Sequence, residues 1–227
     1  MHDIVYILKE DAEADELRYS LRSLSNFPHG KVWFFGGQPE GLMPDKAVPL
    51  EQKGVTSWDK VKWTIEQVCR TREVTDDFWL FNDDFFVMKP VEEWTPKYDK
   101  TIYRRIQQIE KRHGGSSYYS SELNFVRELL TLEHLKTYNY AVHMPMLINK
   151  RKALEVIRKF PRCPMFRCVY GNYWRVGGEQ MADCKITDPA QEPEDTVMLS
   201  TSDGSFRHGL VGEYIKNAFP DKCRYEE

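Results

Sequence analysis

The chain has 227 residues, of which 41% are hydrophobic and 30% are charged, and its formal net charge is −3. A chain of this length and composition is not mainly disordered, and we expect one folded domain over residues 1–227. It has no apolar stretch of the roughly 18–20 residues that cross a bilayer, which excludes an integral membrane protein, and no basic and apolar leader of the kind that a signal peptide needs.

The charges are unevenly distributed. Residues 97–180 contain 16 basic and 7 acidic side chains, a net charge of +9, whereas residues 1–96 have −7 and residues 181–227 have −5. A basic segment in an otherwise acidic chain indicates either a surface that meets phosphates or a set of solvated helix faces, and the sequence leaves both open. The five cysteines are odd in number and contain no CxxC pair, so we expect reduced thiols and a cytoplasmic protein.

The first third of the chain alternates between strands and helices. Residues 4–8 are short, β-branched and apolar, like a buried strand. Residues 16–24 place their leucines on one face of a helix, and residues 31–35 form a second strand. This order is the start of a βαβ arrangement.

The middle of the chain brings polar residues to the end of a strand. A loop over residues 36–57 and a helix over 58–72 precede a third buried strand at 78–81. This strand ends directly in Asn-Asp-Asp at 82–84, and residues 85–88 continue as extended chain. Ligands of open parallel sheets bind beyond the carboxyl ends of the strands, so residues 82–84 are placed to meet one.

The second half is richer in helices. With the first half, it predicts an α/β nucleotide-binding core with a mostly parallel sheet and a helical insertion at about 97–140. Helices are expected over 101–113, 120–137, 150–160, 166–174 and 211–219, and short strands at 145–148, 185–187 and 196–200.

Asp83 and Asp84 are adjacent carboxylates after an apolar strand. Such carboxylates repel each other in apolar surroundings, and a divalent cation removes the conflict. Mg²⁺ and Mn²⁺ take oxygen ligands, and one or two carboxylates with diphosphate oxygens often suffice. The sequence therefore favours a metal site here, and the alternative is a tight turn inside a hairpin, which Asn and Asp also favour.

Several motifs resemble known families. The carboxylates resemble the DxD element of glycosyltransferases with the GT-A fold. A broader resemblance, over about two thirds of the chain, is to the Stealth family of capsular polysaccharide phosphotransferases and related phage glycosyltransferase-like proteins. The sequence departs from Stealth proteins after the first strand, where Ile-Leu-Lys-Glu replaces Trp-Val-Asp-Gly. The matching motifs are Asp3-Ile-Val-Tyr6, Glu16-Leu-Arg-Tyr-Ser-Leu-Arg-Ser-Leu24, Leu80-Phe-Asn-Asp-Asp84, Lys89-Pro-Val91 and His143-Met-Pro145.

The resemblance implies a GT-A-like fold, a nucleotide-sugar donor, Mn²⁺ or Mg²⁺ as cofactor, and a bacterial or phage-infected cell as the location. Asn82 and Asp83 are expected to bind the donor. Arg18 and Arg22 lie one helical turn apart and could hold its diphosphate, although pairing with nearby acidic residues is the alternative. The resemblance to GT-A enzymes also implies a late histidine, His208, as a third metal ligand beside Asp83 and Asp84.

The remaining candidates concern the acceptor. Asp183 or His143 is expected to deprotonate an acceptor hydroxyl, and a structural role is the alternative for each. Aromatic side chains stack on sugars and bases and arginines neutralise phosphates, although packing in the core is the alternative for some members of this segment. The candidate acceptor-binding residues are Arg167, Tyr173, Trp174 and Arg175.

The predicted function is metal-dependent transfer of a sugar from a nucleotide sugar to a hydroxyl group, on a glycan or on a hydroxylated base in phage DNA. One alternative is transfer of a sugar phosphate, as in the Stealth family, and another is a binding module without catalysis. P-loop and dinucleotide-binding functions lose their main support, because neither glycine-rich motif is present.

Overall fold

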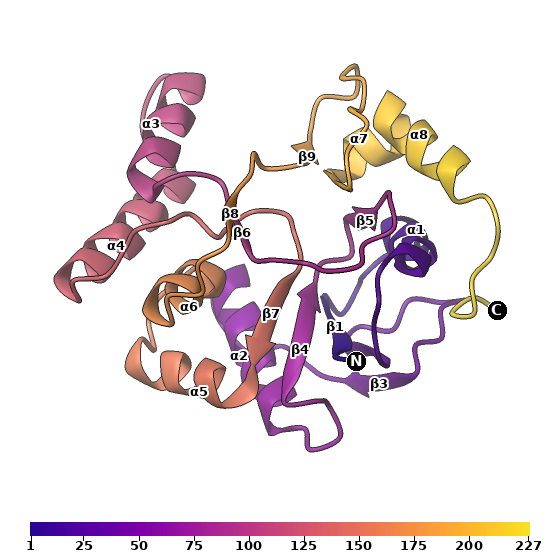
Figure 1. Cartoon of the computed structure of the whole chain (residues 1–227), viewed down its shortest axis with the longest axis horizontal. Coiled ribbons are helices and arrows are strands. Elements are labelled where there is room, and N and C mark those ends of the chain that lie inside the picture. The colour runs from indigo at the N-terminus through magenta and orange to yellow at the C-terminus, as the bar shows by residue number, and fades with distance from the viewer.

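A five-stranded sheet forms the centre of the computed structural model, which describes residues 1–227 (Figure 1). Its strand order is β3-β2-β1-β4-β7, for β1 (Asp3–Leu8), β2 (Val32–Gly36), β3 (Lys46–Pro49), β4 (Asp77–Phe81) and β7 (Met146–Asn149). The first four strands are parallel, and β7 runs antiparallel to β4. The carboxyl ends of four strands therefore share one edge, and β7 begins at that same edge.

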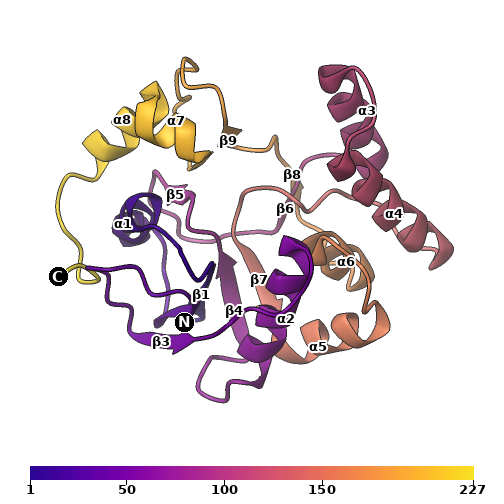
Figure 2. The same cartoon turned by 180° about the vertical axis from the view of Figure 1, so that it is seen from behind.

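Side chains alternate between the two faces of the sheet, and helices cover both. Val5 faces a core that includes α2 (Ser57–Arg70), whereas Tyr6 faces a second core that includes α1 (Ala14–Ser23). Figures 1 and 2 show α2 behind and in front of the sheet, respectively. The first face is completed by α5 (Lys150–Lys159) and α6 (Phe166–Tyr173), and α1 continues into the short 3-10 helix η1 (Leu24–Asn26). The predicted α/β class with a mostly parallel sheet is confirmed.

A helical arm stands at one end of the molecule. It consists of α3 (Ile102–His113) and α4 (Tyr118–Leu132), which lie within the segment 97–140 predicted as a helical insertion (Figure 2). The helix expected to reach residue 137 ends earlier, because His134 adopts a left-handed backbone with φ of 54°. The arm joins the body through β6 (Lys97–Tyr98), which pairs with β8 (Glu179–Gln180).

A second, smaller sheet has the order β5-β10-β9. In this sheet β5 (Phe85–Val87) pairs with β10 (Met198–Thr201) and β10 pairs with β9 (Lys185–Ile186), while α7 (Asp203–His208) and α8 (Leu210–Ala218) pack against it. Because β5 leaves the central sheet, β4 and β5 do not form a hairpin. The Asn-Asp-Asp segment is the link between the two sheets.

Several elements were not predicted, among them the short η1, β6 and β8, the strand β3 and the helix α7. The strand β3 lies within the expected loop, where its exposed side chains give no buried-strand pattern. The sequence Asp203-Gly204 reads as a turn, but it begins the helix α7, because Ser202 and Ser205 form a capping box.

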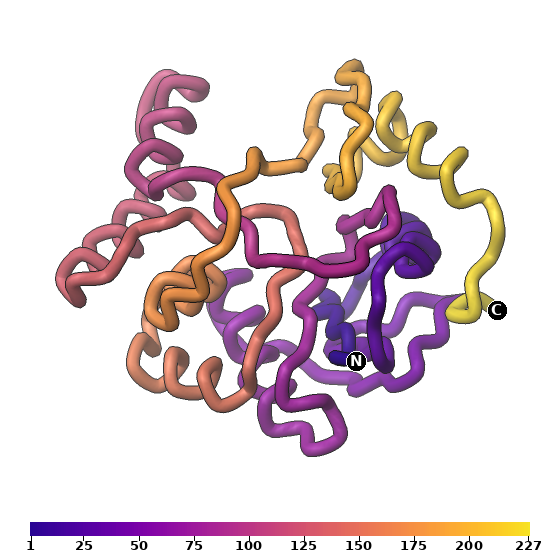
Figure 3. Tube along the Cα trace, viewed as in Figure 1, coloured from indigo at the N-terminus to yellow at the C-terminus, as the bar shows by residue number.

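The tube in Figure 3 shows the C-terminal tail returning to the N-terminal half of the chain, where Glu226 forms an isolated antiparallel β-bridge with Leu42. None of the helices has the length and apolarity needed to cross a membrane.

Candidate active site

A cavity of about 1080 Å³ lies at the carboxyl edge of the central sheet. Its walls come from the segment after β1, the start of α2, the tip of β4, the segment before β7 and the start of α6. The carboxyl end of β4 and the beginning of β7 meet here, because β7 is antiparallel to β4 and its Met146 pairs with Leu80. The cavity thus brings together polar side chains from distant parts of the chain, namely Lys9, Asn82, Asp83, Arg105, His143, Arg167 and Lys185.

A smaller cavity of about 220 Å³ adjoins the first. The two share Lys9, Asp11 and Asp83, so Asp83 lies where they meet. The smaller cavity is lined mainly by carboxylates, including Glu16 of α1 and Asp203 of α7. Burial and the charge of neighbouring Asp84 raise the pKa of Asp83 above its ordinary value. The region therefore favours a positively charged ligand or counter-ion.

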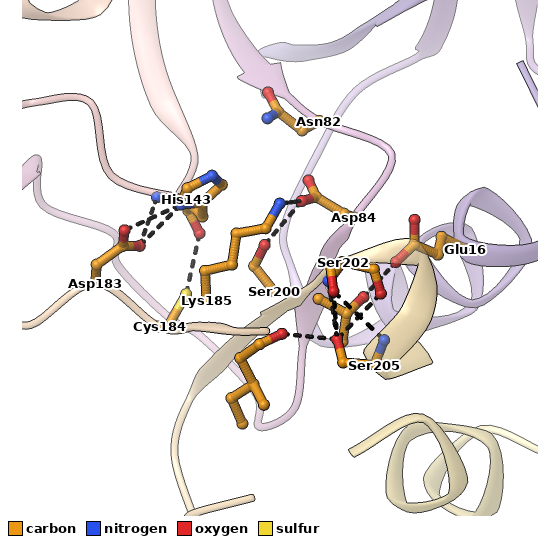
Figure 4. Close-up of polar contacts among 12 residues, drawn as sticks. Glu16, Asn82, Asp84, His143, Asp183, Cys184, Lys185, Ser200, Ser202 and Ser205 are labelled. Atoms are coloured by element: carbon orange, nitrogen blue, oxygen red, sulfur yellow. Dashed lines mark hydrogen bonds and ion pairs between the residues drawn. The ribbon is translucent and has the colours of Figure 1, made fainter. Parts of the chain in front are cut away.

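Asp84 is buried behind the cavity wall, with 7% of its surface exposed. Its Oδ2 atom accepts hydrogen bonds from Lys185 Nζ at 2.8 Å and from Ser200 Oγ at 2.9 Å (Figure 4). Its Oδ1 atom is buried and has no hydrogen-bond partner in the protein. A buried carboxylate oxygen without a partner is costly unless a ligand or ion satisfies it.

A hard divalent cation would satisfy the unpartnered Oδ1 atom of Asp84. The carboxylates of Asp83 and Asp84 fit such a cation, because two carboxylates and diphosphate oxygens make a sufficient ligand set. His208 does not join them. It is exposed at the end of α7 and lines neither cavity. No group of three or more His, Cys, Asp or Glu side chains is arranged to hold a metal. The sequence could not reveal that His208 lies away from Asp83 and Asp84, because it does not show how α7 is oriented.

His143 and Asp183 form a close pair. Asp183 accepts hydrogen bonds from the backbone N–H of His143 at 3.1 Å and from ring atom Nδ1 at 3.0 Å (Figure 4). Burial alone would raise the pKa of Asp183, but the hydrogen bonds from His143 and the charge of Arg105, 3.6 Å away, hold it below its ordinary value. His143 lines the cavity and Asp183 lies behind it. The ring nitrogen Nε2 is therefore the one left for a ligand.

Arg167, expected to bind the acceptor, lies in the cavity wall, but its guanidinium is engaged by the protein. Its Nη1 atom donates to the carbonyls of Val142 and Met144, and its Nη2 atom donates to Asn82 Oδ1 at 2.9 Å. Burial lowers the pKa of Arg167 to about 10. All these partners are neutral, so the positive charge of Arg167 has no carboxylate in direct contact.

Arg18 and Arg22, expected to hold the donor, line neither cavity. Both bind the carboxylate of Glu226 in the C-terminal tail, at 2.8 Å from Arg18 Nη1 and 2.7 Å from Arg22 Nε. Helical spacing correctly places the two on one face of α1. It does not indicate that the chain's last residues pack on that face.

The other expected acceptor residues also lie outside the cavities. Tyr173 donates a hydrogen bond to Glu155 of α5, and Trp174 donates one to the carbonyl of Lys152 on the same helix. Arg175 is exposed to solvent beyond α6. Only the N-terminal part of α6, with Arg167, reaches the cavity, so the residues two turns further on face α5 or solvent.

Sequence reasoning missed several cavity residues. Lys9 directly follows β1, so the strand-end argument that singled out Asn82 could have found it. Lys185 stands at the start of a two-residue strand, and nothing in its local sequence identifies Asp84 as its partner. The aromatic wall is formed by Trp58 and Tyr119, whose ring centroids are 6.4 Å apart. Trp58 belongs to α2 and Tyr119 to α4, and the two are too far apart in the chain for a sequence pattern to show that they meet.

No protein-family model matches the chain, and no curated protein matches it. Among solved structures, it is similar to the galactosyltransferase LgtC in complex with donor and acceptor sugar analogs, with a TM-score of 0.51 and 11% sequence identity over 99% of this chain and 98% of that chain. An active-site mutant of LgtC matches with a TM-score of 0.46 and 10% identity over 98% of both chains. The first match, together with the mostly parallel sheet and its flanking helices, shows that the chain has a GT-A-type glycosyltransferase fold.

Proposed function

We propose that the protein is a glycosyltransferase that moves a sugar from a nucleotide-sugar donor to an acceptor hydroxyl group. The observation that carries this proposal is the meeting of two pairs at one cavity of a GT-A-type fold. One is Asp83 in the cavity wall with Asp84 behind it, and the other is His143 in the wall with Asp183 behind it. A carboxylate pair at a strand end suits a diphosphate with its counter-ion, and a histidine held by a carboxylate suits proton transfer.

His143 is the proposed general base. Its Nε2 atom would take the proton of the acceptor hydroxyl as the acceptor oxygen bonds to the anomeric carbon of the sugar. The bond between that carbon and the diphosphate breaks, and its electron pair leaves with the diphosphate. Asp183 would act on the ring of His143, because it accepts from Nδ1 and stabilises the imidazolium that forms.

Asp83 and Asp84 Oδ1 would hold Mg²⁺ or Mn²⁺ together with the donor. When bound, the cation would neutralise the charge of the diphosphate. Asn82 stands beside this pair with its amide oxygen fixed by Arg167, and its amide nitrogen remains available as a donor to the nucleotide sugar.

A glycan is the proposed acceptor. Trp58 and Tyr119 offer aromatic surface in the cavity wall, and aromatic rings stack on the apolar faces of sugars. The sugar analogs bound to LgtC support the same class. The basic segment of residues 97–180 supports a DNA acceptor less, because Arg105 and Arg167 are its only basic side chains that line the cavity, and both contact other groups of the protein.

The test is a donor screen with product analysis. We expect one nucleotide sugar, in the presence of Mn²⁺, to stabilise the protein by about 2–4 kcal/mol at saturation. We also expect release of a nucleoside diphosphate when a glycan is added. Release of a nucleoside monophosphate would show sugar-phosphate transfer, as in the Stealth family, and modification of hydroxylated DNA would assign the acceptor to nucleic acid. Failure of every donor to bind would contradict the proposal.

A further inference from the structure

Lys185 is a partly buried cation that the sequence did not single out. Its Nζ atom lies 2.8 Å from Asp84 Oδ2, and a quarter of its side chain (25%) remains exposed. Figure 4 shows the side chain extending past His143 to reach Asp84. Lys185 also lines the larger cavity, so the exposed part faces the proposed substrate.

The hydrogen-bonding capacity of Lys185 is only partly used. An ammonium group has three N–H donors, and Asp84 Oδ2 is the only atom in the protein to which Lys185 Nζ donates. Lysine is ordinarily charged at neutral pH, and the carboxylate of Asp84, 2.8 Å away, is the counter-charge of Lys185. The remaining N–H donors are therefore available to an anion in the cavity.

The other cations around the cavity are less well placed for this role. Arg167 donates from both terminal nitrogens to neutral groups of the protein. Arg105 lies 3.6 Å from Asp183 and 3.8 Å from Asp99, so its charge is shared by two carboxylates outside the Asp83–Asp84 pair. Lys9 is exposed and makes no hydrogen bond or ion pair that would fix its position. Lys185 alone is both held in place and left with free donors beside the carboxylate pair.

We propose that Lys185 binds the diphosphate of the donor and of the nucleoside diphosphate product. This inference rests on the proposed function and deepens it. In the transfer step the bond from the anomeric carbon to the diphosphate oxygen breaks, and the electron pair stays on that oxygen. Lys185 stabilises the added negative charge while keeping its own proton. A consequence is that nucleoside diphosphate binding persists when divalent cations are removed.

Isothermal titration calorimetry in EDTA tests this consequence. The probes are uridine, guanosine, adenosine, cytidine and thymidine diphosphates, and the variants are Lys185→Met and Lys185→Arg. We expect the nucleotide that binds the unmodified protein to bind Lys185→Met at least ~10-fold more weakly, because charge-assisted hydrogen bonds to phosphate are lost. Lys185→Arg keeps the charge and should retain most of the affinity. Lys89→Met is the matched control, since Lys89 pairs with Asp195 on the surface.

Lys185→Met also leaves Asp84 without its counter-charge, which destabilises the fold. The double variant Asp84→Asn, Lys185→Met removes both charges, and Ser200 can still donate to the side-chain oxygen of the new amide, so its affinity in EDTA reports on Lys185 in a folded protein. Unchanged affinity in both variants would overturn the inference, as would nucleotide binding that requires Mn²⁺ in the unmodified protein. Absence of any nucleotide binding, with or without Mn²⁺, would instead overturn the proposed function.

Discussion

Arg167 donates a hydrogen bond from Nη2 to Asn82 Oδ1 at 2.9 Å. Its Nη1 atom donates to the carbonyls of Val142 and Met144, the residues on either side of His143, at 3.2 and 2.9 Å. One guanidinium thus joins the tip of β4 to the segment that precedes β7. Because Arg167 projects from the buried start of α6, it fixes the carboxylate end of the cavity relative to the proposed base.

The first prediction concerns this connection. Arg167→Lys retains the charge but not the planar fork, so it cannot hold Asn82 and both carbonyls together. We expect the free energy of unfolding to fall by about 1–3 kcal/mol in urea denaturation. We also expect kcat to fall at least ~10-fold, because a small displacement of a catalytic group is costly. Arg175→Lys, on the exposed end of the same segment, should change neither quantity. Normal kcat in Arg167→Lys would refute the positioning role.

The second prediction concerns the His143–Asp183 pair. His143→Gln removes the proposed base, and we expect kcat to fall by about 10²–10⁴-fold, the usual range for general-base catalysis. Asp183→Asn leaves a hydrogen-bond partner but removes the charge, so a smaller loss is expected. Donor affinity, measured by calorimetry, should change little in either variant. If His143→Gln retained full turnover, proton transfer would have to be assigned to another group.

Strand periodicity made much of the fold and part of the site predictable. The strands β1, β2 and β4 are apolar and short, so their ends could be located, and with them Asn82 and Asp83. His143 was found through its motif. Its place beside β4 follows from the antiparallel direction of β7, which the sequence did not specify.

Partners that lie far apart in the chain could not be predicted. Lys185 and Asp84 are separated by 101 positions, and Arg18 and Glu226 by 208. A helix pattern shows which residues share a face but not which segment packs on it. The sequence therefore leaves Arg18 and Arg22 open between a diphosphate and nearby acidic residues, whereas in the structure both bind Glu226 of the C-terminal tail.

The third prediction concerns that tail. The carboxylate of Glu226 is fully buried between Arg18 and Arg22. Burial would raise its pKa, but hydrogen bonds from Arg22, Cys223 and Arg18 outweigh this effect and lower it to about 2. Glu226→Gln should therefore lower the free energy of unfolding by about 1–3 kcal/mol at pH 7. Glu227→Gln, at the exposed neighbouring position, is the control.

The pH dependence gives this prediction a second check. Because the pKa of Glu226 is lower in the folded protein, its stabilising effect is complete above the ordinary value of 4.5 and is lost as the pH falls towards 2. The difference between Glu226→Gln and the unmodified protein should therefore shrink between pH 5 and about pH 3 in urea denaturation. Donor affinity should be unchanged in Glu226→Gln. A loss of donor binding in this variant would indicate that Arg18 and Arg22 bind the donor after all.

The fourth prediction concerns Glu16, which lines the smaller cavity and accepts a hydrogen bond from Thr201. Burial raises its pKa to about 8, with smaller contributions from the charges of Asp84 and Asp83. An unfolded chain ionises this group near 4.5, so ionisation penalises only the folded state. The contribution of Glu16 to stability is therefore fully present below pH 4.5 and is lost as the pH rises through 8.

Glu16→Gln keeps a hydrogen-bond acceptor for Thr201 and cannot ionise. We therefore expect the variant and the unmodified protein to be about equally stable near pH 4, and the variant to gain an advantage that grows with pH. The advantage should reach about 1–3 kcal/mol near pH 8–9, after allowing for the partial exposure of the side chain. Urea midpoints measured from pH 4 to 9 give this difference directly. A difference that stays constant over the range would mean that Glu16 ionises normally, and that the carboxylates around the smaller cavity are compensated by solvent or ions.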